Sequence, residues 1–207
     1  MILRLPILIL MWSVTLVLAA QDTTYYQFSG KMKSIGLSID DQREGSWNFY
    51  YARGTLSAQL VYNGGRLDGK QHYYFPSESL QAIEIWDQDV LQDSAFYYYE
   101  SGALEKKGEY INNLYTGEWQ FYHLNGRLKR SGNYHEGTPV GHWQFFYERG
   151  GVWQEGTLSS GLESGLWQYY DELGQLQYLG EYEQGRQIGV WYKYNRQGKK
   201  RKWKQFD

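Results

Sequence analysis

The chain has 207 residues, among them 21 tyrosines, 9 tryptophans, 8 phenylalanines and 24 glycines, but only 3 prolines and no cysteine. Its formal net charge of -2 provides no general attraction to nucleic acid or to an anionic membrane, so a nucleic-acid-binding function is disfavoured. The lack of cysteine excludes a disulfide framework and a thiolate metal site. Many rings and glycines are typical of strands and tight turns.

Residues 1–20 have the pattern of a secretory signal peptide. Arg4 supplies a positive start, the run from Leu5 to Leu18 is almost wholly apolar, and two alanines follow. An uncleaved membrane anchor is the alternative, although the run is shorter than the roughly 20 residues that span a bilayer. We therefore expect a cleaved signal and a periplasmic or secreted protein, with no cysteine to carry a bacterial lipid anchor.

The rest of the chain repeats with a period of 24 residues, and the register does not slip. Residues 21–44 form a partial repeat and residues 45–207 a continuous array. The anchor positions are Gly45, Gly69, Asp93, Gly117, Gly141, Gly165 and Gly189. A tryptophan column follows two residues later, at Trp47, Trp119, Trp143, Trp167 and Trp191, and a second glycine column comprises Gly108, Gly132, Gly156 and Gly180. Such self-similarity indicates an array in which each unit packs on its neighbours.

One unit, residues 117–134, predicts a β-hairpin. Its Asn125-Gly126 pair favours a type I′ turn, because both residues tolerate positive φ. A two-residue turn there would place Trp119 opposite Gly132, Phe121 opposite Arg130 and His123 opposite Leu128. The glycine column would then make room for the indole of the facing strand, so that the ring of Trp119 lies across Gly132.

The alternation of side chains in a strand assigns the residues of this unit to two faces. One face is expected to carry the tryptophan and glycine columns together with Phe121, Leu128 and Tyr134. The other would carry Gln120, Tyr122, Lys129, Ser131 and Asn133, and would be polar apart from its tyrosine.

The segment from Ser77 to Gln92 departs from the pattern, because it lacks the turn glycine. Leu80, Ile83, Val90 and Leu91 have a spacing close to that of a helix. A short helix and a divergent hairpin are both compatible with it, and the unbroken register favours the hairpin.

The run from Gly180 to Trp191, echoed at Gly132 to Trp143 and at Gly108 to Trp119, resembles the MORN repeat variant of many bacterial proteins. Its recurring motif is Gly-x-Tyr-x-x-Gly-x-x-x-Gly-x-Trp. The resemblance implies an extended sheet of β-hairpins and a binding role, and some members are labelled antitoxins. Related arrays have been proposed to contact membrane lipids or to act as scaffolds. The export signal argues against a cytosolic antitoxin. We expect an all-β, elongated, single-layer antiparallel meander of about seven hairpin repeats.

A tyrosine column on the polar face is the candidate binding surface. It comprises Tyr50, Tyr74, Tyr98, Tyr122, Tyr170 and Tyr194, flanked by Gln120, Gln144 and Gln168. Rings beside amides offer flat apolar area and hydrogen bonds, which suits protein partners and polysaccharides. The alternative is that these rings stack on one another and merely cover the backbone.

The only dense charge run lies near the C-terminus, at Lys199, Lys200, Arg201, Lys202 and Lys204. It could contact an anionic lipid, cell-wall polymer or nucleic acid. Alternatively, the cations prevent the exposed edge of the last strand from pairing with another chain.

Catalytic patterns are missing from the sequence. The histidines, at 72, 123, 135 and 142, occupy different repeat positions and have no metal-ligand spacing, and no nucleophile elbow or phosphate-binding loop occurs. We expect no metal and no cofactor. The sequence thus predicts a non-enzymatic interaction module, antitoxin-like or immunity-like, with another protein as its partner. The alternatives are a glycan or cell-envelope ligand for the tyrosine column, and a membrane-associated scaffold that contacts anionic lipid.

Overall fold

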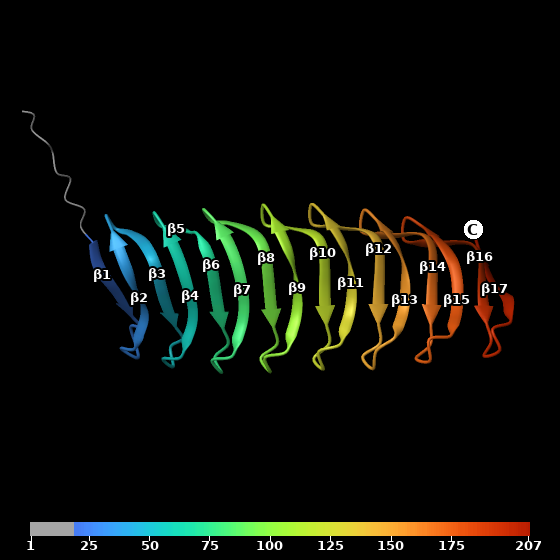
Figure 1. Cartoon of the computed structure of the whole chain (residues 1–207), viewed down its shortest axis with the longest axis horizontal. Coiled ribbons are helices and arrows are strands. Elements are labelled where there is room, and N and C mark those ends of the chain that lie inside the picture. The colour runs from blue at the N-terminus through green and yellow to red at the C-terminus, as the bar shows by residue number, and fades with distance from the viewer. Residues whose placement is uncertain (1–18) are drawn as a thin grey trace, which may run out of the picture.

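The computed structural model describes residues 19–207, and these residues form one open, antiparallel, single-layer sheet (Figure 1). The predicted signal peptide lies outside the described residues, apart from its last two alanines. Successive strands pair along the chain, except that the short β5 and the following β6 both pair with β4, so the sheet is an elongated meander, as predicted. The strands are β1 (Ala19–Tyr25), β2 (Met32–Ile39), β3 (Gln42–Tyr50), β4 (Leu56–Asn63), β5 (Arg66–Leu67), β6 (Gly69–Tyr74), β7 (Leu80–Asp87), β8 (Val90–Tyr98), β9 (Leu104–Ile111), β10 (Leu114–Tyr122), β11 (Leu128–His135), β12 (Thr138–Phe146), β13 (Val152–Ser159), β14 (Leu162–Tyr170), β15 (Leu176–Glu183), β16 (Arg186–Tyr194) and β17 (Lys200–Phe206).

The ambiguous segment from Ser77 to Gln92 is a hairpin, so the alternative of a short helix is wrong. Strands β7 and β8 pair there through a turn at Gln88 and Asp89, which both have positive φ, 48° and 69°. The turn glycine that the repeat lacks is at position 78, where Glu78 itself adopts positive φ, 70°. Across residues 19–207 the structure contains no helix that could cross a membrane.

The turn at Asn125-Gly126 is not the predicted type I′ turn. Only Gly126 has positive φ, 81°; its N–H donates to the carbonyl of His123 (2.9 Å), and the N–H of His123 donates to the carbonyl of Arg127 (2.8 Å). This is the pattern of a three-residue loop that ends in a left-handed glycine. Type I′ geometry occurs instead at the opposite edge of the sheet, as at Glu136-Gly137, where both φ values are positive.

The longer loop changes the register near the turn. Trp119 lies opposite Gly132 and Phe121 opposite Arg130, as predicted, but a β-bulge then places Tyr122, rather than His123, opposite Leu128. Because directly opposed residues share a face, Leu128 lies with Tyr122. Its predicted place on the tryptophan side is therefore wrong.

The indole rings cover glycines, but each covers a glycine on the other neighbouring strand. A Cβ on Gly132 would lie 2.2 Å from the indole of Trp143, and one on Gly108 would lie 2.3 Å from that of Trp119. On β10, three residues at 117–119 oppose the single Gly108 of β9, and this bulge turns the ring across the bare backbone. The expectation that Trp119 lies across Gly132 is therefore wrong: the covered glycine comes 11 residues before the tryptophan.

The same geometry recurs in five units, where each tryptophan is almost fully buried. In four of the five, the indole N–H also donates to the carbonyl of the residue after the covered glycine, as from Trp119 to Glu109 (3.1 Å); Trp143 instead donates to Val140. The covered glycines and their rings are Gly36 with Trp47, Gly108 with Trp119, Gly132 with Trp143, Gly156 with Trp167 and Gly180 with Trp191.

Two units replace this couple with other residue pairs. In the first, Gln71 stands where the tryptophan would be and is fully buried; its amide accepts from the N–H of Val61 (2.6 Å) and donates to the carbonyl of Val61 (3.1 Å). In the second, Glu84 stands at the glycine position and the facing residue is the small, fully buried Ala95. Tryptophan is thus absent wherever the preceding strand carries a side chain.

Substitution of Gly132 by alanine should destabilise the fold by several kcal/mol, because the new methyl group would overlap the indole of Trp143. In a Trp143→Ala background, which itself costs about 3–5 kcal/mol, the same substitution should be nearly neutral. Urea unfolding of the double-mutant cycle measures this coupling. The matched cycle with Trp119→Ala should show much weaker coupling, and equal coupling in both cycles would contradict the pairing described above.

Candidate functional site

The two sides of the sheet differ in chemistry. We call the side that carries Trp119, Phe121 and Tyr134 the tryptophan face, and the side that carries Gln120, Gln144 and Gln168 the amide face. On the tryptophan face the rings contact one another from unit to unit; the ring of Tyr134, for example, packs edge-on against Trp143 with 5.3 Å between centroids. On the amide face, the strand registers align one row across the sheet: His72, Ile83, Phe96, Lys107, Gln120, Ser131, Gln144, Glu155, Gln168, Leu179 and Tyr192.

The predicted tyrosine column lies on the amide face and is half-buried along its whole length. From Tyr50 to Tyr170, each tyrosine of the column faces an aliphatic residue across a bulge; for instance, Tyr122 faces Leu128 and Tyr170 faces Leu176. The last member, Tyr194, faces Lys200 instead and lies outside this pattern. Successive tyrosines are two strands, or about 10 Å, apart, which exceeds the distance of ring contact. The column therefore forms a mixed stripe of phenol rings and aliphatic side chains. We call it the tyrosine stripe: Tyr50, Leu56, Tyr74, Leu80, Tyr98, Leu104, Tyr122, Leu128, Phe146, Val152, Tyr170 and Leu176.

Polar side chains of the amide face hold several of these rings in place. The hydroxyl of Tyr122 donates to Gln120 Oε1 (2.6 Å), and the hydroxyl of Tyr74 donates to Gln59 Oε1 (2.9 Å). Such contacts fix the ring orientations before any partner arrives, which reduces the entropy lost on binding.

A polar cluster that the sequence analysis missed surrounds Glu155. The carboxylate accepts from the hydroxyl of Tyr170 (2.7 Å) and from the amide of Gln144 (2.9 Å), and His142 Nε2 lies 3.4 Å away. The hydrogen bond from Tyr170 is the main reason why the pKa of Glu155 lies below its usual value. Burial, followed by this carboxylate, raises the pKa of Tyr170 to about 12. The predicted residues Gln144 and Tyr170 are thus joined through an acid at the next position of the row.

The amide face is not polar throughout, contrary to the pattern read from residues 117–134. At its C-terminal end Leu166, Leu179, Ile188 and Val190 line a surface hollow of about 240 Å³, and Leu166 is 52% exposed. The same columns hold Glu118 and Ser131 in the unit from which the polar face was predicted. One unit therefore does not represent the whole face.

Four of the five residues in the basic run lie on β17, the last strand of the sheet, and Lys199 immediately precedes it. Their side chains divide between the two faces. Lys202 is opposite Tyr192 on the amide face, whereas Arg201 is opposite Lys193, which packs against Tyr178 on the other side. The five charges do not converge on one point, and this arrangement suits protection of a sheet edge.

Another column missed by the sequence analysis connects the units along the loop edge. The hydroxyl of Tyr99 donates to the carbonyl of Tyr122 (2.8 Å), and that of Tyr147 to the carbonyl of Tyr170 (2.8 Å). Tyr51 makes the same bond to Tyr74, and His123 Nε2 lies 3.2 Å from the carbonyl of Phe146. These residues come one position after the tyrosine column, so a ring at that position was the available signal.

The four histidines do not meet. His123 belongs to the loop edge, His142 contacts Glu155, and no group of three potential metal ligands occurs within residues 19–207. The hollows along the described sheet are open to solvent on one side of a single layer. Chemically, the arrangement offers ordered rings, amides and local charges over a long surface.

Replacement of Tyr170 by phenylalanine should raise the pKa of Glu155, because its strongest hydrogen bond is lost. A carboxylate with a lowered pKa stabilises the fold above its ordinary pKa, and this stabilisation disappears as pH falls through the lowered value. The stability lost in Y170F should therefore be largest near neutral pH and should shrink in acid. Carboxyl NMR titration and pH-dependent unfolding measure both effects.

Tyr122→Phe is the matched control, because the hydroxyl of Tyr122 bonds to an amide rather than to a carboxylate. Phenylalanine already occupies the same column at Phe146, so both variants should fold. An unchanged pKa of Glu155 in Y170F would contradict the assigned contact.

Replacement of Lys200, Arg201, Lys202 and Lys204 by glutamine should promote self-association, because an uncharged edge strand exposes unpaired backbone groups. Sedimentation velocity should show larger species in the variant than in the native chain, and the native chain should shift in the same direction in high salt. A variant that stays monomeric but loses an anionic ligand would instead support the ligand-contact interpretation.

Comparison with known proteins identifies the repeat. The family described as "MORN repeat variant" matches residues 94–112, 115–136 and 163–184, which fall on β8 to β11 and β14 to β15. No curated protein matches the chain. Among solved structures, a chain in "Crystal Structure of TcdB2-TccC3-Cdc42" is similar with 14% sequence identity and a TM-score of 0.25, over 88% of this chain and 12% of that chain. This chain thus spans a small part of that one, and a score so low supports no argument about function. These three segments carry repeats of the MORN variant family, and they share the register of the whole sheet.

Proposed function

We propose that the protein is a non-enzymatic interaction module that binds another protein through the tyrosine stripe of its amide face. The observation that carries this proposal is the continuity of the stripe. Half-buried tyrosines and aliphatic residues alternate across the sheet beside a row of amides, and the hydroxyls of several rings are already oriented.

The repeat family supports the general part of the proposal. MORN repeats are generally protein-interaction or membrane-interaction modules and are not catalytic. A single-layer sheet suits this role, because every unit adds area to the same surface without enclosing a cavity. Tyrosine is enriched in protein interfaces, where its ring contributes apolar contact and its hydroxyl a hydrogen bond.

The site of action in this proposal is the periplasm or the cell exterior, because of the signal-like sequence at residues 1–20. An antitoxin-like or immunity-like role fits if the partner is a toxic protein that meets this chain after export. A glycan of the cell envelope is the second candidate ligand, because ordered phenol–amide pairs such as Tyr122 with Gln120 also suit sugar hydroxyls. A scaffold that contacts anionic lipid through β17 is the third.

The decisive experiment compares the native chain with the double variant Tyr122→Ala/Tyr170→Ala. The proposal expects one stoichiometric protein partner to co-purify from envelope extract with the native chain, and binding of that purified partner to weaken at least about tenfold in the double variant. Tyr122→Phe/Tyr170→Phe is the matched control, which keeps the rings and should retain most of the binding.

Parallel measurements separate the three candidates. Glycan-array binding that the double alanine variant abolishes, with no protein partner, would favour the envelope ligand. Binding to anionic vesicles that falls steeply with salt, and is lost when the cations of β17 are replaced, would favour the lipid scaffold. A protein partner that binds the double alanine variant as tightly as the native chain would refute the stripe as the contact surface.

A further inference from the structure

A charged hollow opens on the tryptophan face, outside the basic run, and extends to the loop edge, where Tyr122 of the tyrosine stripe forms part of its lining. It has a volume of about 300 Å³ and lies where β9, β10 and β11 meet. Three cationic side chains line it, namely Lys106, Lys129 and Arg130, together with a single acidic one, Glu105. Lys129 was expected only on the polar face, but it is the extra residue of the bulge between Arg130 and Leu128 and also lines this hollow. The lining thus carries a net charge of about +2, in a protein whose total formal charge is -2.

Aromatic groups, rather than carboxylates, hold two of these cations. Lys106 Nζ donates to the hydroxyl of Tyr115 (2.7 Å) and lies 4.2 Å from the ring centroid of Tyr97. The guanidinium of Arg130 lies 4.2 Å from the ring centroid of Phe121. Both ion pairs found among residues 19–207 lie elsewhere, at His142 with Glu155 and at Arg149 with Glu172. Cation–π contacts position a charge without neutralising it.

A second carboxylate on the same face is already engaged. Glu84 accepts hydrogen bonds from Trp86 Nε1 (3.0 Å) and from the hydroxyl of Tyr97 (2.7 Å). These hydrogen bonds are part of the packing of the unit that has Ala95 at the tryptophan position. The positive charge of the hollow therefore remains available to an external anion.

The repeat shows that packing does not require these cations. Lys106 and Arg130 occupy the same column in successive units, and both lie opposite Phe121. Elsewhere the equivalent position holds Ser34, Ala58, Ala82, Gln154, Tyr178 and Arg201. The sheet forms in those units with small or neutral residues in most cases, so the two neighbouring cations are a local departure from what the fold needs.

The walls of the hollow are suited to a ring-shaped ligand. Tyr115 is fixed by stacking on Trp119, with 3.8 Å between ring centroids, and Tyr134 packs edge-on against Tyr115 at 5.0 Å. The volume is at the lower end of the usual range for ligand sites, which limits the occupant to a group of about one sugar ring. Aromatic walls accept the apolar face of such a ring, and phenol hydroxyls can bond to its hydroxyl groups.

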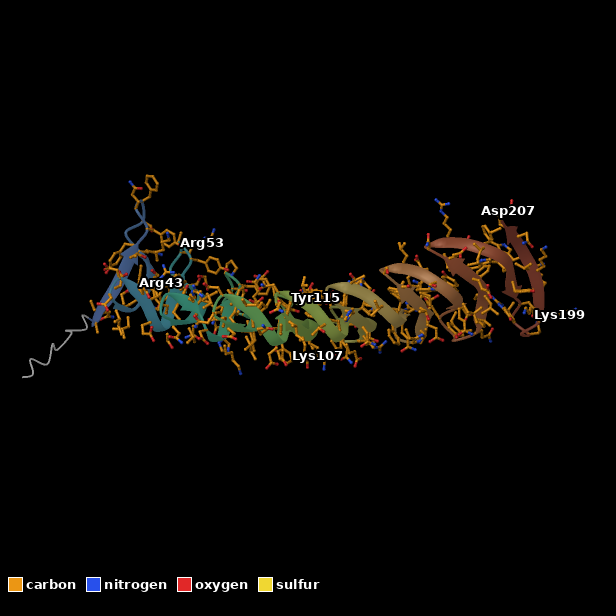
Figure 2. All side chains as sticks on the ribbon, turned by 90° about the horizontal axis from the view of Figure 1, so that it is seen from above. Arg43, Arg53, Lys107, Tyr115, Lys199 and Asp207 are labelled. Atoms are coloured by element: carbon orange, nitrogen blue, oxygen red, sulfur yellow. The ribbon has the colours of Figure 1, made fainter. Side chains whose placement is uncertain are left out.

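We propose that this hollow binds an anionic sugar residue, whose carboxylate or sulfate group pairs with Lys106, Lys129 and Arg130 while its ring lies against the tyrosines. Lys106, Arg130 and the rings of Tyr115 and Tyr134 lie on the opposite face from the row of amides, and Tyr122 is the residue that the site shares with the tyrosine stripe. Lys106 and Arg130 are not part of the stripe, so substitutions of these two residues test this site separately from the protein partner proposed above, and either proposal can fail alone. Figure 2 shows the two faces, with Tyr115 and Lys107 labelled on different sides of the ribbon.

The test uses the full chain and isothermal titration with four probes: trigalacturonate, a sulfated disaccharide, the neutral sugar maltotriose, and inorganic sulfate. Tryptophan fluorescence gives a second readout, because Lys106 lies 5.7 Å from the ring centroid of Trp119. At least one anionic sugar should bind with a change in fluorescence, and maltotriose should bind at least about tenfold more weakly. Affinity should fall as salt increases.

The variants follow the natural variation of the column. Lys106→Ala copies Ala82 and Arg130→Gln copies Gln154, so both should fold, and each should weaken binding at least about tenfold. Lys107→Gln is the matched control: it removes an equal charge from the adjacent residue, whose side chain lies on the amide face, and should leave the affinity unchanged.

Three results would overturn the proposal. Equal binding of inorganic sulfate and the anionic sugars would show a simple anion site with no role for the ring. Equal loss of affinity in Lys107→Gln would show nonspecific attraction to the sheet. Absence of binding by every anionic sugar, with the native chain folded, would leave the hollow without the proposed ligand.

Discussion

The structure depends on one contact: an indole ring that lies flat over the backbone of a glycine in the preceding strand. A single layer has no second sheet to cover its apolar residues, so each unit must bury its own largest ring. The glycine leaves a gap of one side chain, the bulge at the anchor position turns the indole into it, and in most units the indole N–H satisfies a carbonyl of the same strand. Burial of one such ring contributes at most about 4–6 kcal/mol, which explains how an array poor in aliphatic residues can fold.

This contact also explains the two irregular units. Where Leu60 replaces the glycine, the tryptophan position holds Gln71, whose amide bonds to the backbone of Val61. Where Glu84 replaces the glycine, the position holds Ala95, and Tyr97 and Trp86 bind the carboxylate. In each irregular unit a smaller residue at the tryptophan position leaves room for the side chain that replaces the glycine, although the chemistry of the pair differs. The sheet can therefore vary locally without losing its register.

Structural residues differ from candidate recognition residues in how regularly they recur along the chain. Columns that recur in every unit form the fold, whereas local departures from a column give the surface its individual chemistry. The pairing of Tyr170 with Glu155, the apolar hollow around Leu166 and the cations beside Phe121 are all departures of this kind. A one-layer sheet exposes both faces, so each face can carry its own local chemistry.

The sequence by itself determined the all-β class, the 24-residue register, the opposition of Trp119 and Gly132, and the side on which the tyrosine column lies, because these follow from periodicity and from alternation along a strand. Only the tertiary structure decided which glycine each indole covers. The choice depends on bulges between strands, which add residues on one side of a pair and are invisible to a constant period. The sequence did contain a signal for this choice. Gly36 stands 11 residues before Trp47, whereas the residue that faces Trp47 on the following strand is Leu60, so only the preceding strand offers a glycine to that ring. The cluster around Glu155 and the hollow beside Arg130 likewise required the structure, because they join side chains of neighbouring strands that a column, read along the chain, keeps apart.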